Sequence, residues 1–414
     1  MAKSKVNKIL ILDLFAGCGG LSDGFLQTKK FEEVAAVEWK KPQIETLKLR
    51  LRSKWGKKDV DDSVLLFDIQ KEEELFKGND EIVGLDKLIK SKKHIDLIIG
   101  GPPCQAYSIA GRVRDENGMK FDYRNFLFEH YLSIVNRYKP DAFIFENVPG
   151  LLSASPMGIP VVKLITDGFA KIGYSVINDL TKTQVNAADF GVPQSRKRLI
   201  ILGLRNEVFG KQNMQSMLDK FYAQILPSFK SKHRLSVKEA IGDLPACEPF
   251  YDESHHKRRV SHNTPDCQIS WHKPRYHNLR DMDTFHILAT DIESGERKYD
   301  SKKITELYAQ KVGSKSPIHR YHVLEPNDVS TTIIAHLHKD GNRFIHYDSK
   351  QCRTITPREA ARLQSFDDDF DFVGNQGSVY EMIGNAVPPK LANCVAKAII
   401  KFLKEFYPLK YDQI

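Results

Sequence analysis

The sequence predicts an α/β fold: a doubly wound, mostly parallel sheet with a second, smaller and irregular domain. Short apolar runs alternate with stretches of helical periodicity through the first half of the chain, which is typical of parallel strands joined by crossover helices. This alternation stops near residue 204, and residues 207–350 are polar and rich in His, Lys, Arg, Pro and Asp. A chain of 414 residues, 41% of them hydrophobic, is long enough to form both parts.

Seven apolar runs have the length and β-branched content of strands that a parallel sheet buries on both faces. They are Lys8–Asp13, Val34–Glu38, Val64–Asp68, Ile95–Ile99, Ala142–Glu146, Ser175–Leu180 and Leu199–Leu204. Helical periodicity predicts helices at Gly20–Thr28, Pro42–Arg52, Glu72–Lys90, Asn125–Tyr138, Pro160–Ile172, Pro357–Phe366 and Pro388–Phe406.

These elements predict three segments: an α/β domain over residues 1–206, an irregular basic domain over 207–350, and a C-terminal segment over 351–414. The last helix carries an apolar stripe that has to be buried, so we expect this segment to return to the first domain and pack beside the first strand. The stripe consists of Leu391, Val395, Ala398, Ile399, Phe402 and Leu403.

Composition narrows the functional classes. Lys and Arg total 62 against 53 Asp and Glu, giving a net charge of +9 and a pI near 9.0, which favours an anionic partner. The six cysteines are scattered without metal-ligand spacing, so we predict no metal site and a reducing compartment. No apolar run approaches the roughly 18 residues of a membrane span, and the first one is too short for an export signal.

Cys104 follows a predicted buried strand, in the segment Gly100-Gly101-Pro102-Pro103-Cys104-Gln105. Two glycines and two prolines end the strand in a rigid turn, at the edge where open α/β sheets place their chemistry. A thiol presented there is a candidate nucleophile. The alternative is a buried, inert thiol.

Three consecutive predicted strands end in residues that suit an adenosine ligand. The first is followed by Gly17–Gly20, whose Gly-x-Gly-Gly order lets a ligand approach the backbone but lacks the dinucleotide spacing. The second ends in Glu38-Trp39, an acceptor for a ribose diol and a ring for stacking on adenine. The third ends in Asp68-Ile69, whose carboxylate suits an adenine amino group. Solvated polar strand ends are the alternative.

Two further strand ends carry charged groups. Glu146 ends the apolar run Ala142–Phe145, where burial would raise the pKa of its carboxyl and let it hold a proton. Around the last strand, alternation would place Gln194, Arg196 and Arg198 on one face. Ordinary solvated charges are the alternative at both places.

In this order, these segments resemble the motifs of the DNA (cytosine-5) methyltransferase family, of the bacterial restriction-modification type. The matching segments lie between residues 13 and 389, nearly the whole chain, although residues 207–350 follow no fixed pattern. They are Asp13–Gly20 (the cofactor loop), Pro103-Cys104-Gln105 (the nucleophile), Glu146-Asn147-Val148 (the acid), Gln194-x-Arg196-x-Arg198 (the arginine motif), Arg358–Phe366 (the helix behind the target domain) and Gly384–Pro389 (the last motif).

The resemblance implies that the Cys104 thiolate adds to carbon 6 of cytosine, so that carbon 5 takes the methyl group of S-adenosylmethionine. It implies that Glu146 protonates or hydrogen-bonds the ring nitrogen and that Arg198 holds the base carbonyl. Arg196 and Asn147 would orient the base and the loop. Since carbon 6 of a stacked base is unreachable, the base has to be flipped out of the duplex.

The resemblance also implies a set of residues that bind S-adenosylmethionine. They are Phe15, Gly17, Gly20, Glu38, Trp39, Asp68, Ile69, Gly101, Pro103, Leu127, Asn385 and Ala386.

By the same resemblance, residues 1–206 form the catalytic and cofactor-binding domain, and residues 207–350 recognise the target on double-stranded DNA. In the latter, His255–Arg259 and Arg275–His277 suit phosphates and base edges, and Thr331-Thr332-Ile333 resembles a dipeptide of such domains. The family type implies a cytoplasmic monomer, associated with the nucleoid when on DNA, without a membrane partner, and a cognate restriction endonuclease that acts separately.

Three other functions compete with this one. A tRNA cytosine-5 methyltransferase would use the same motifs, but looped RNA would not need so long a second domain. A catalytically inactive DNA-binding module is disfavoured by the presence of Cys104, Glu146 and Arg198. The order of the glycines disfavours a nucleotide-dependent oxidoreductase.

Overall fold

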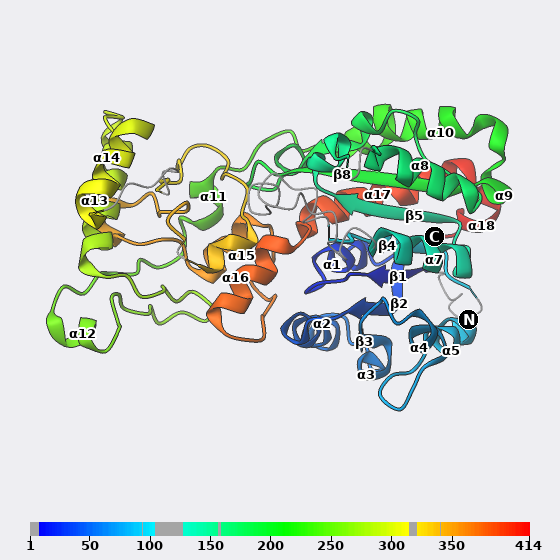
Figure 1. The fold of residues 1–414 in the computed structure, drawn as a ribbon, viewed down its shortest axis with the longest axis horizontal. Coiled ribbons are helices and arrows are strands. Elements are labelled where there is room, and N and C mark those ends of the chain that lie inside the picture. Colours follow the sequence, from blue (N-terminus) through cyan, green and yellow to red (C-terminus); the bar gives the residue numbers. More distant parts are fainter. Residues whose placement is uncertain (1–7, 93, 104–126, 156–158, 314–320, 340) are drawn as a thin grey trace, which may run out of the picture. The chain divides into compact units, whose positions relative to one another are not determined.

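The computed structural model describes residues 8–92, 94–103, 127–155, 159–313, 321–339 and 341–414. Cys104 and the first two residues of the helix predicted from Asn125 lie outside the described residues. The chain forms two compact units (Figure 1). The first unit comprises residues 1–191, 197–232 and 387–414, and the second comprises 192–196 and 233–386.

The units divide the chain at other residues than the three predicted segments. Residues 207–232 lie in the first unit, and residues 351–386 lie in the second. Of the predicted C-terminal segment, only residues 387–414 belong to the unit that holds the sheet. The role predicted for each segment remains a prediction.

The first unit is built on a sheet whose described strands follow the order β3-β2-β1-β4-β5-β8-β6, with β7 also paired to β8. β1 to β5 are parallel to one another, and β8 is antiparallel to β5, β6 and β7, so the predicted mostly parallel sheet is confirmed. The strands are β1 (Ile9–Leu14), β2 (Phe31–Glu38), β3 (Val64–Leu66), β4 (Leu97–Gly100), β5 (Ala142–Asn147), β6 (Tyr174–Ser175), β7 (Gln184–Asn186) and β8 (Lys197–Arg205).

Helices connect and cover these strands (Figure 1). The α-helices of the first unit are α1 (Gly20–Leu26), α2 (Lys41–Ser53), α3 (Val60–Ser63), α4 (Glu72–Lys77), α5 (Leu85–Lys92), α7 (Leu127–Tyr138), α8 (Val161–Lys171), α9 (Asn206–Phe209), α10 (Met214–Lys220), α17 (Pro389–Phe406) and α18 (Pro408–Tyr411). Its shorter turns are η3 (Pro149–Ser153), η5 (Leu180–Thr183), η6 (Ala187–Phe190), η7 (Lys211–Asn213), η8 (Phe221–Ile225) and η9 (Leu226–Phe229). No helix in the described part of the chain is long and apolar enough to cross a membrane.

Two helical layers cover the sheet. On one side α1 and α2 are joined by an ion pair in which Arg50 Nε lies 2.7 Å from Asp23 Oδ1, both side chains being buried. On the other side Tyr131 of α7 packs edge-on against Phe143 and Phe145 of β5. Right-handed crossovers place helices on opposite faces once the strand order reverses, as it does here beside β1.

α17 returns to the first unit, as the apolar stripe predicts. All six stripe residues are buried. The helix packs on α1 at Gly24, where an added Cβ would lie 2.4 Å from the Pro389 carbonyl oxygen and 2.5 Å from Ala392 Cβ. Asn393 Nδ2 donates to the Gly24 carbonyl oxygen at 3.0 Å. The end of the chain therefore completes the layer that begins with α1.

Two sequence predictions within the first unit are wrong. The single helix over Glu72–Lys90 is two helices, α4 and α5, because Gly78 adopts a left-handed φ of 85° and Gly84 packs directly on it. The strand over Ser175–Leu180 is reduced to the two residues of β6, since its apolar residues turn into the core and η5 begins at Leu180.

The second unit contains more helix than predicted. α13 runs for 16 residues between an Asn278 cap, whose side chain accepts from Asp281 N, and Gly295 at a φ of 73°. α13 and α14 bury one face in a core around Phe285, Leu307 and Tyr321. The elements of the unit are α11 (Val237–Ile241), α12 (Glu253–Lys257), α13 (Leu279–Ser294), α14 (Ser301–Val312), η10 (Ala335–His338), η11 (Ser349–Gln351), α15 (Pro357–Leu363) and α16 (Gln376–Asn385).

A buried polar network fills the centre of the second unit. Arg353 donates to both carboxylate oxygens of Glu359 at 2.7 Å, and both side chains are 1% exposed. Burial acts to raise the pKa of Glu359, but Arg353 outweighs it and holds that pKa at about 2. Burial lowers the pKa of His262 and of His346 to about 4, and Arg353 adds to both shifts. These histidines are therefore neutral where an exposed histidine would titrate.

We expect the second unit to lose stability between pH 7.5 and pH 5.5. Unfolded histidine titrates near pH ~6.5, so below that pH the unfolded chain binds protons that folded His262 and His346 do not. Linkage then lowers the free energy of unfolding by about 1 kcal/mol per histidine at pH 5.5. Hydrogen-exchange protection factors of residues 233–386 measure it. His346→Asn should reduce this pH dependence, because His262 still contributes, and His338→Asn, at an exposed position, should leave it unchanged; equal protection of the wild type at both pH values contradicts the prediction.

Candidate functional site

The candidate site begins where the strand order reverses. The chain places β2 and β3 on one side of β1 and then returns to place β4 on the other side. In open α/β sheets, ligands bind beyond the carboxyl ends of the strands at this point. β1 and β4 end here close together: a Cβ on Gly100 would lie 2.4 Å from the Leu14 carbonyl oxygen.

The loop after β1 has an unusual backbone. Phe15, Gly17 and Gly19 all adopt left-handed φ values, of 59°, 57° and 90°. At Gly19 an added Cβ would lie 2.5 Å from Leu47 Cδ1, so α2 packs against this glycine. At Gly17 nothing lies within 4 Å of that position. The loop is thus fixed on one side and open at Gly17, where a ligand can approach the backbone. The predicted Gly20 begins α1 and is buried.

Glu38, at the end of β2, holds this loop. Its Oε2 accepts from Gly17 N at 3.0 Å, and its Oε1 accepts from Trp39 N at 2.9 Å and from Lys40 N at 3.0 Å. Burial raises the pKa of Glu38, while these N–H groups act to lower it. Beside it the Trp39 side chain is 55% exposed, which is unusual for a large aromatic ring and suits stacking on a planar ligand.

The other predicted cofactor residues of the first unit lie near strand ends. Asp68 is half-buried, and its Oδ1 accepts from Gln70 N at 3.1 Å, which fixes the carboxylate beyond β3. Ile69 and Leu127 are buried, and Leu127 begins α7. Gly101 and Pro103 follow β4.

Asp13, at the end of β1, has no role assigned to it from the sequence. Burial, and then the nearby Glu33, raise the pKa of Asp13 well above its usual range. Among the described residues, Asp13 Oδ2 and both carboxylate oxygens of Glu33 have no hydrogen-bond partner. A carboxyl within an otherwise apolar strand was the available signal.

Glu146 and Arg198 form an ion pair across β5 and β8. Arg198 Nε lies 2.9 Å from Glu146 Oε1, and each side chain is only 13% exposed. Burial lowers the pKa of Arg198, and the carboxylate opposes that shift. The second oxygen, Oε2, lies toward Gly101: a Cβ there would be 2.6 Å from it. Residue 101 therefore has to be glycine for this carboxylate to keep its position.

Asn147 ties β5 to the turn that precedes Cys104. Its Nδ2 donates to the Pro102 carbonyl oxygen at 3.3 Å, and its Oδ1 accepts from Val148 N at 2.8 Å. Asn147 is buried. Within the described part of this turn, Asn147 thus holds Pro102 and the Glu146 carboxylate lies close to Gly101, while Cys104 lies outside the described residues.

Of the arginine motif only Arg198 lies in a strand, and the expectation that Gln194, Arg196 and Arg198 share one face stays a prediction. β8 begins at Lys197, and residues 192–196 belong to the second unit. There the buried Arg196 donates to the carbonyl oxygens of Ile333 (2.7 Å), Gly384 (2.9 Å) and Ala386 (3.1 Å). Arg198 instead pairs with Glu146 in the first unit.

The neighbours of Arg196 reinforce the same junction. Gln194 is buried, accepts from Ile333 N at 2.8 Å, and donates to the Leu363 carbonyl oxygen at 3.1 Å and to Gln364. Thr332 Oγ1 donates to the Ser195 carbonyl oxygen at 2.7 Å. Residues 194–196 therefore bind the segment around Thr331-Thr332-Ile333 to the end of α16.

Asn385 and Ala386 lie at that end of α16, in the second unit. The Ala386 carbonyl oxygen accepts from Arg196 and from Gln364 Nε2, the latter at 2.7 Å, and Asn385 is exposed. Their predicted contact with a cofactor in the first unit remains a prediction.

The residues of the two basic runs, His255–Arg259 and Arg275–His277, have different environments in the second unit. His277 is buried, and burial holds its pKa well below the usual range, so it does not supply a cation. His255 pairs with Asp252 at 2.7 Å and stacks on Phe250. Arg259 and Arg275 lie beside tyrosine rings.

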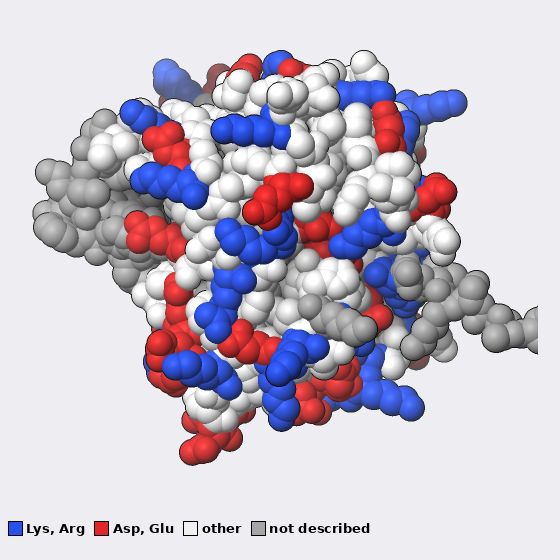
Figure 2. Space-filling view, turned by 90° about the vertical axis from the view of Figure 1, so that its right-hand side faces the viewer, with Lys and Arg blue, Asp and Glu red and all other residues white. Residues whose placement is uncertain are grey.

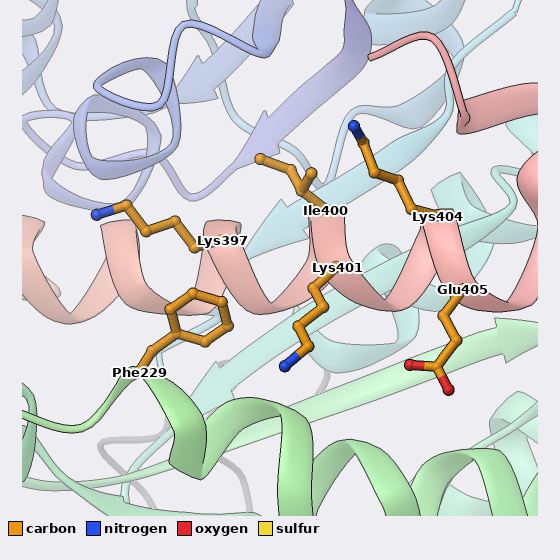
Figure 3. Close-up of a pocket in the computed structure, with 6 residues that line it drawn as sticks. All are labelled: Phe229, Lys397, Ile400, Lys401, Lys404 and Glu405. Carbon is orange, nitrogen blue, oxygen red and sulfur yellow. The ribbon is translucent and has the colours of Figure 1, made fainter.

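A surface pocket of the first unit lies outside the candidate site. Figure 3 shows it between α17 and Phe229, with the side chains of Lys397, Lys401 and Glu405 around it. Lys401 Nζ donates to Ser228 Oγ at 3.4 Å, and Glu405 pairs with Lys220. None of the predicted site residues lines it.

The residues at the carboxyl ends of β1, β2 and β3 fit an adenosine-containing cofactor. The open backbone at Gly17, the exposed ring of Trp39 and the fixed carboxylates of Glu38 and Asp68 all belong to loops that follow β1, β2 and β3. Hydroxyl and amino groups of a nucleoside are donors that such carboxylates accept from.

Comparisons with known proteins agree with one another. A family model described as C-5 cytosine-specific DNA methylase matches residues 9–401. The type II methyltransferase M.Bpa9945I of Bacillus paralicheniformis is 31% identical, over 94% of this chain and 98% of that protein. The type II methyltransferase M.NgoFVII of Neisseria gonorrhoeae is 30% identical, over 98% of this chain and 90% of that protein. A solved structure of a DNA modification methyltransferase from an E. coli prophage shares the fold, with a TM-score of 0.57 and 24% identity. The match covers 96% of this chain and 100% of that chain.

We expect Arg196→Lys to destabilise the second unit although it keeps the charge. An ammonium group cannot reach three carbonyl oxygens with the planar geometry of a guanidinium. The loss should be roughly 2–4 kcal/mol, seen as weaker hydrogen-exchange protection of residues 330–386. The reciprocal change Lys197→Arg, at the exposed neighbouring position, is the control. If both variants keep full protection, Arg196 does not secure this junction.

Proposed function

The chain belongs to the C-5 cytosine-specific DNA methylase family, and we propose that it flips a cytosine out of a specific duplex DNA sequence and methylates carbon 5 through a covalent adduct with Cys104. The observation that carries this proposal is the Glu146–Arg198 ion pair. It lies across two strands beside the turn that leads to Cys104.

The proposed reaction assigns one role to each residue. The Cys104 thiolate forms a bond to carbon 6, and carbon 5 becomes nucleophilic toward the incoming methyl group. Glu146 hydrogen-bonds or protonates the ring nitrogen, and Arg198 holds the base carbonyl. A proton acceptor then removes the proton from carbon 5, and the Cys104 thiolate leaves carbon 6 as the double bond between carbons 5 and 6 re-forms.

Two residues act by positioning. Asn147 supports the turn before Cys104 through the Pro102 carbonyl oxygen. Arg196, which the resemblance grouped with the orienting residues, contacts backbone carbonyls of the second unit, and this supports a role in holding the recognition segment.

S-adenosylmethionine would supply the methyl group. We propose that Glu38 holds its ribose, Trp39 stacks on its adenine, Asp68 accepts from the adenine amino group, and the Phe15–Gly20 loop passes close to its remaining atoms. Gly101, Pro103, Ile69 and Leu127 would complete the pocket in the first unit. We also propose Asn385 and Ala386 as cofactor-binding residues.

We infer that residues 207–350 include the target-recognition surface, as the resemblance implies. Relatives named type II methyltransferases support a restriction-modification role, in which a cognate endonuclease acts separately. We propose that the protein works as a monomer in the bacterial cytoplasm, associated with the nucleoid when on DNA.

Methyl transfer from labelled S-adenosylmethionine, offered in parallel to duplex DNA and to tRNA, tests the proposed function. Label should enter the DNA alone, at carbon 5 of cytosine, and bisulfite sequencing of a plasmid from an expressing host should reveal one recurring sequence. Label in tRNA alone would favour the tRNA methyltransferase. Label in neither substrate would favour an inactive binding module.

Duplex DNA with 5-fluorocytosine in place of cytosine should trap the protein in an adduct that survives denaturing electrophoresis. Fluorine at carbon 5 cannot leave as a proton does, so Cys104 cannot be expelled. Cys104→Ala should give no adduct. Cys267→Ala, which removes another partly exposed thiol, should trap as the wild type does. An adduct with the Cys104→Ala protein would refute the assignment.

Glu146→Gln should lower turnover by roughly 10²–10⁴-fold while leaving cofactor affinity nearly unchanged, because its proposed action is on the base. Single-turnover methyl transfer and calorimetric binding of S-adenosylmethionine measure the two effects. Glu129→Gln, an exposed change of the same kind on α7, is the control. Unchanged turnover with weakened cofactor binding would move Glu146 into the cofactor pocket.

A further inference from the structure

The net positive charge of this chain does not make each of its faces basic. Figure 2 shows one face on which Lys and Arg are interspersed with Asp and Glu. A net charge of +9 therefore need not imply a uniform basic surface, and a local cluster of cations is the more informative feature. One such cluster lines a pocket within the second unit.

The pocket combines basic side chains with tyrosine rings. Arg259, Arg275, His338 and Lys339 line it, and within the described part of the chain no acidic side chain does. Arg259 and Lys339 are exposed to solvent, so a ligand can reach their charged groups. A pocket with this composition attracts an anion.

The guanidinium of Arg275 is held in place. Its Cζ lies 4.3 Å from the centre of the Tyr380 ring, and its Nη2 donates to the Leu337 carbonyl oxygen at 2.7 Å. Gly341 makes room for it, since a Cβ there would lie 3.3 Å from Arg275 Cζ. The buried Arg275 Nε has no hydrogen-bond partner in the described residues. This charge is pre-organised and keeps an unused donor.

Arg259 lies beside the second tyrosine that lines the pocket. Its Cζ lies 5.7 Å from the centre of the Tyr276 ring, and its own backbone adopts a left-handed φ of 56°. A non-glycine residue in that conformation carries a cost that is usually found where a side chain has to be aimed.

The pocket also includes the first turn of α16. Gln376 and Gly377 line it, and Gln376 is anchored by donating to the Lys273 carbonyl oxygen at 2.9 Å. The first N–H groups of a helix have no partner inside it, and the helix dipole favours negative charge there. This turn of α16 has no acidic residue. It adds to the cations without being needed to define the site.

We propose that this pocket binds a backbone phosphate of the DNA substrate and that Arg259 and Lys339 are its contact cations. The inference rests on the proposed function. A phosphate suits the pocket because, among the described residues, every charged side chain that lines it is basic, and Arg and Lys are the side chains that contact phosphate oxygens most often. The contact would add affinity and register but no sequence preference.

The test compares two double variants that remove equal charge. Arg259→Gln/Lys339→Gln alters the pocket, and Lys90→Gln/Lys171→Gln removes two exposed lysines of α5 and α8 in the first unit. Affinity for a 30-base-pair mixed-sequence duplex is measured across a salt series by fluorescence anisotropy. Each lost phosphate contact lowers the slope of log K against log salt by about 0.9. We expect a fall of about 1 for the pocket variant and a smaller one for the control.

Bisulfite sequencing of a plasmid methylated by each variant completes the test. The set of methylated sequences should stay that of the wild type. An altered set in the pocket variant would mean that the pocket reads bases, and a salt slope equal to that of the control would mean that it contacts no phosphate; either result overturns the inference alone. A wild-type protein that neither binds nor methylates duplex DNA would overturn the proposed function as well.

Discussion

The reversal of strand order beside β1 is the constraint on which the candidate site depends. Because β2 and β4 flank β1, the loops that leave β1, β2 and β4 emerge at the same edge of the sheet. Glu38 then fixes the first of these loops through Gly17 N, and β5 brings Glu146 beside the last. Glycine at position 101 is required by the same crowding, since a side chain would collide with the Glu146 carboxylate. The chemistry is therefore positioned by backbone topology before any ligand arrives.

The second unit is organised by charge rather than by an apolar core alone. Arg196 and Arg353 are both nearly fully buried, and each is surrounded by acceptors: backbone carbonyls for Arg196 and the Glu359 carboxylate for Arg353. A buried charge is costly unless it is paired, so each arginine can tolerate only one arrangement of its neighbours. Buried polar centres of this kind specify a single geometry for the loops attached to them, which is what a surface that discriminates between ligands needs.

Local patterns predicted the parts of the site that local structure determines. Glu38 and Glu146 end apolar runs, so their place at the sheet edge followed from strand length, and the stripe of α17 required burial. The contacts of Arg196 could not be predicted in this way, because they join residues that lie 137 and 188 positions apart in the sequence. The pocket around Arg275 likewise depends on segments that only the tertiary fold brings together, and Cys104 lies outside the described residues.

The return of α17 to α1 has a consequence for biosynthesis. The sheet unit is interrupted by the second unit, and its last helix comes from the end of the chain. At translation rates of about 5–20 residues per second, the roughly 150 intervening residues take about 8–30 s to make. During that interval the surface of α1 around Gly24 waits uncovered on the ribosome, while the second unit can already fold. A chain that ends before residue 387 therefore has a sheet that lacks its closing helix, and the α1 surface around Gly24 stays uncovered.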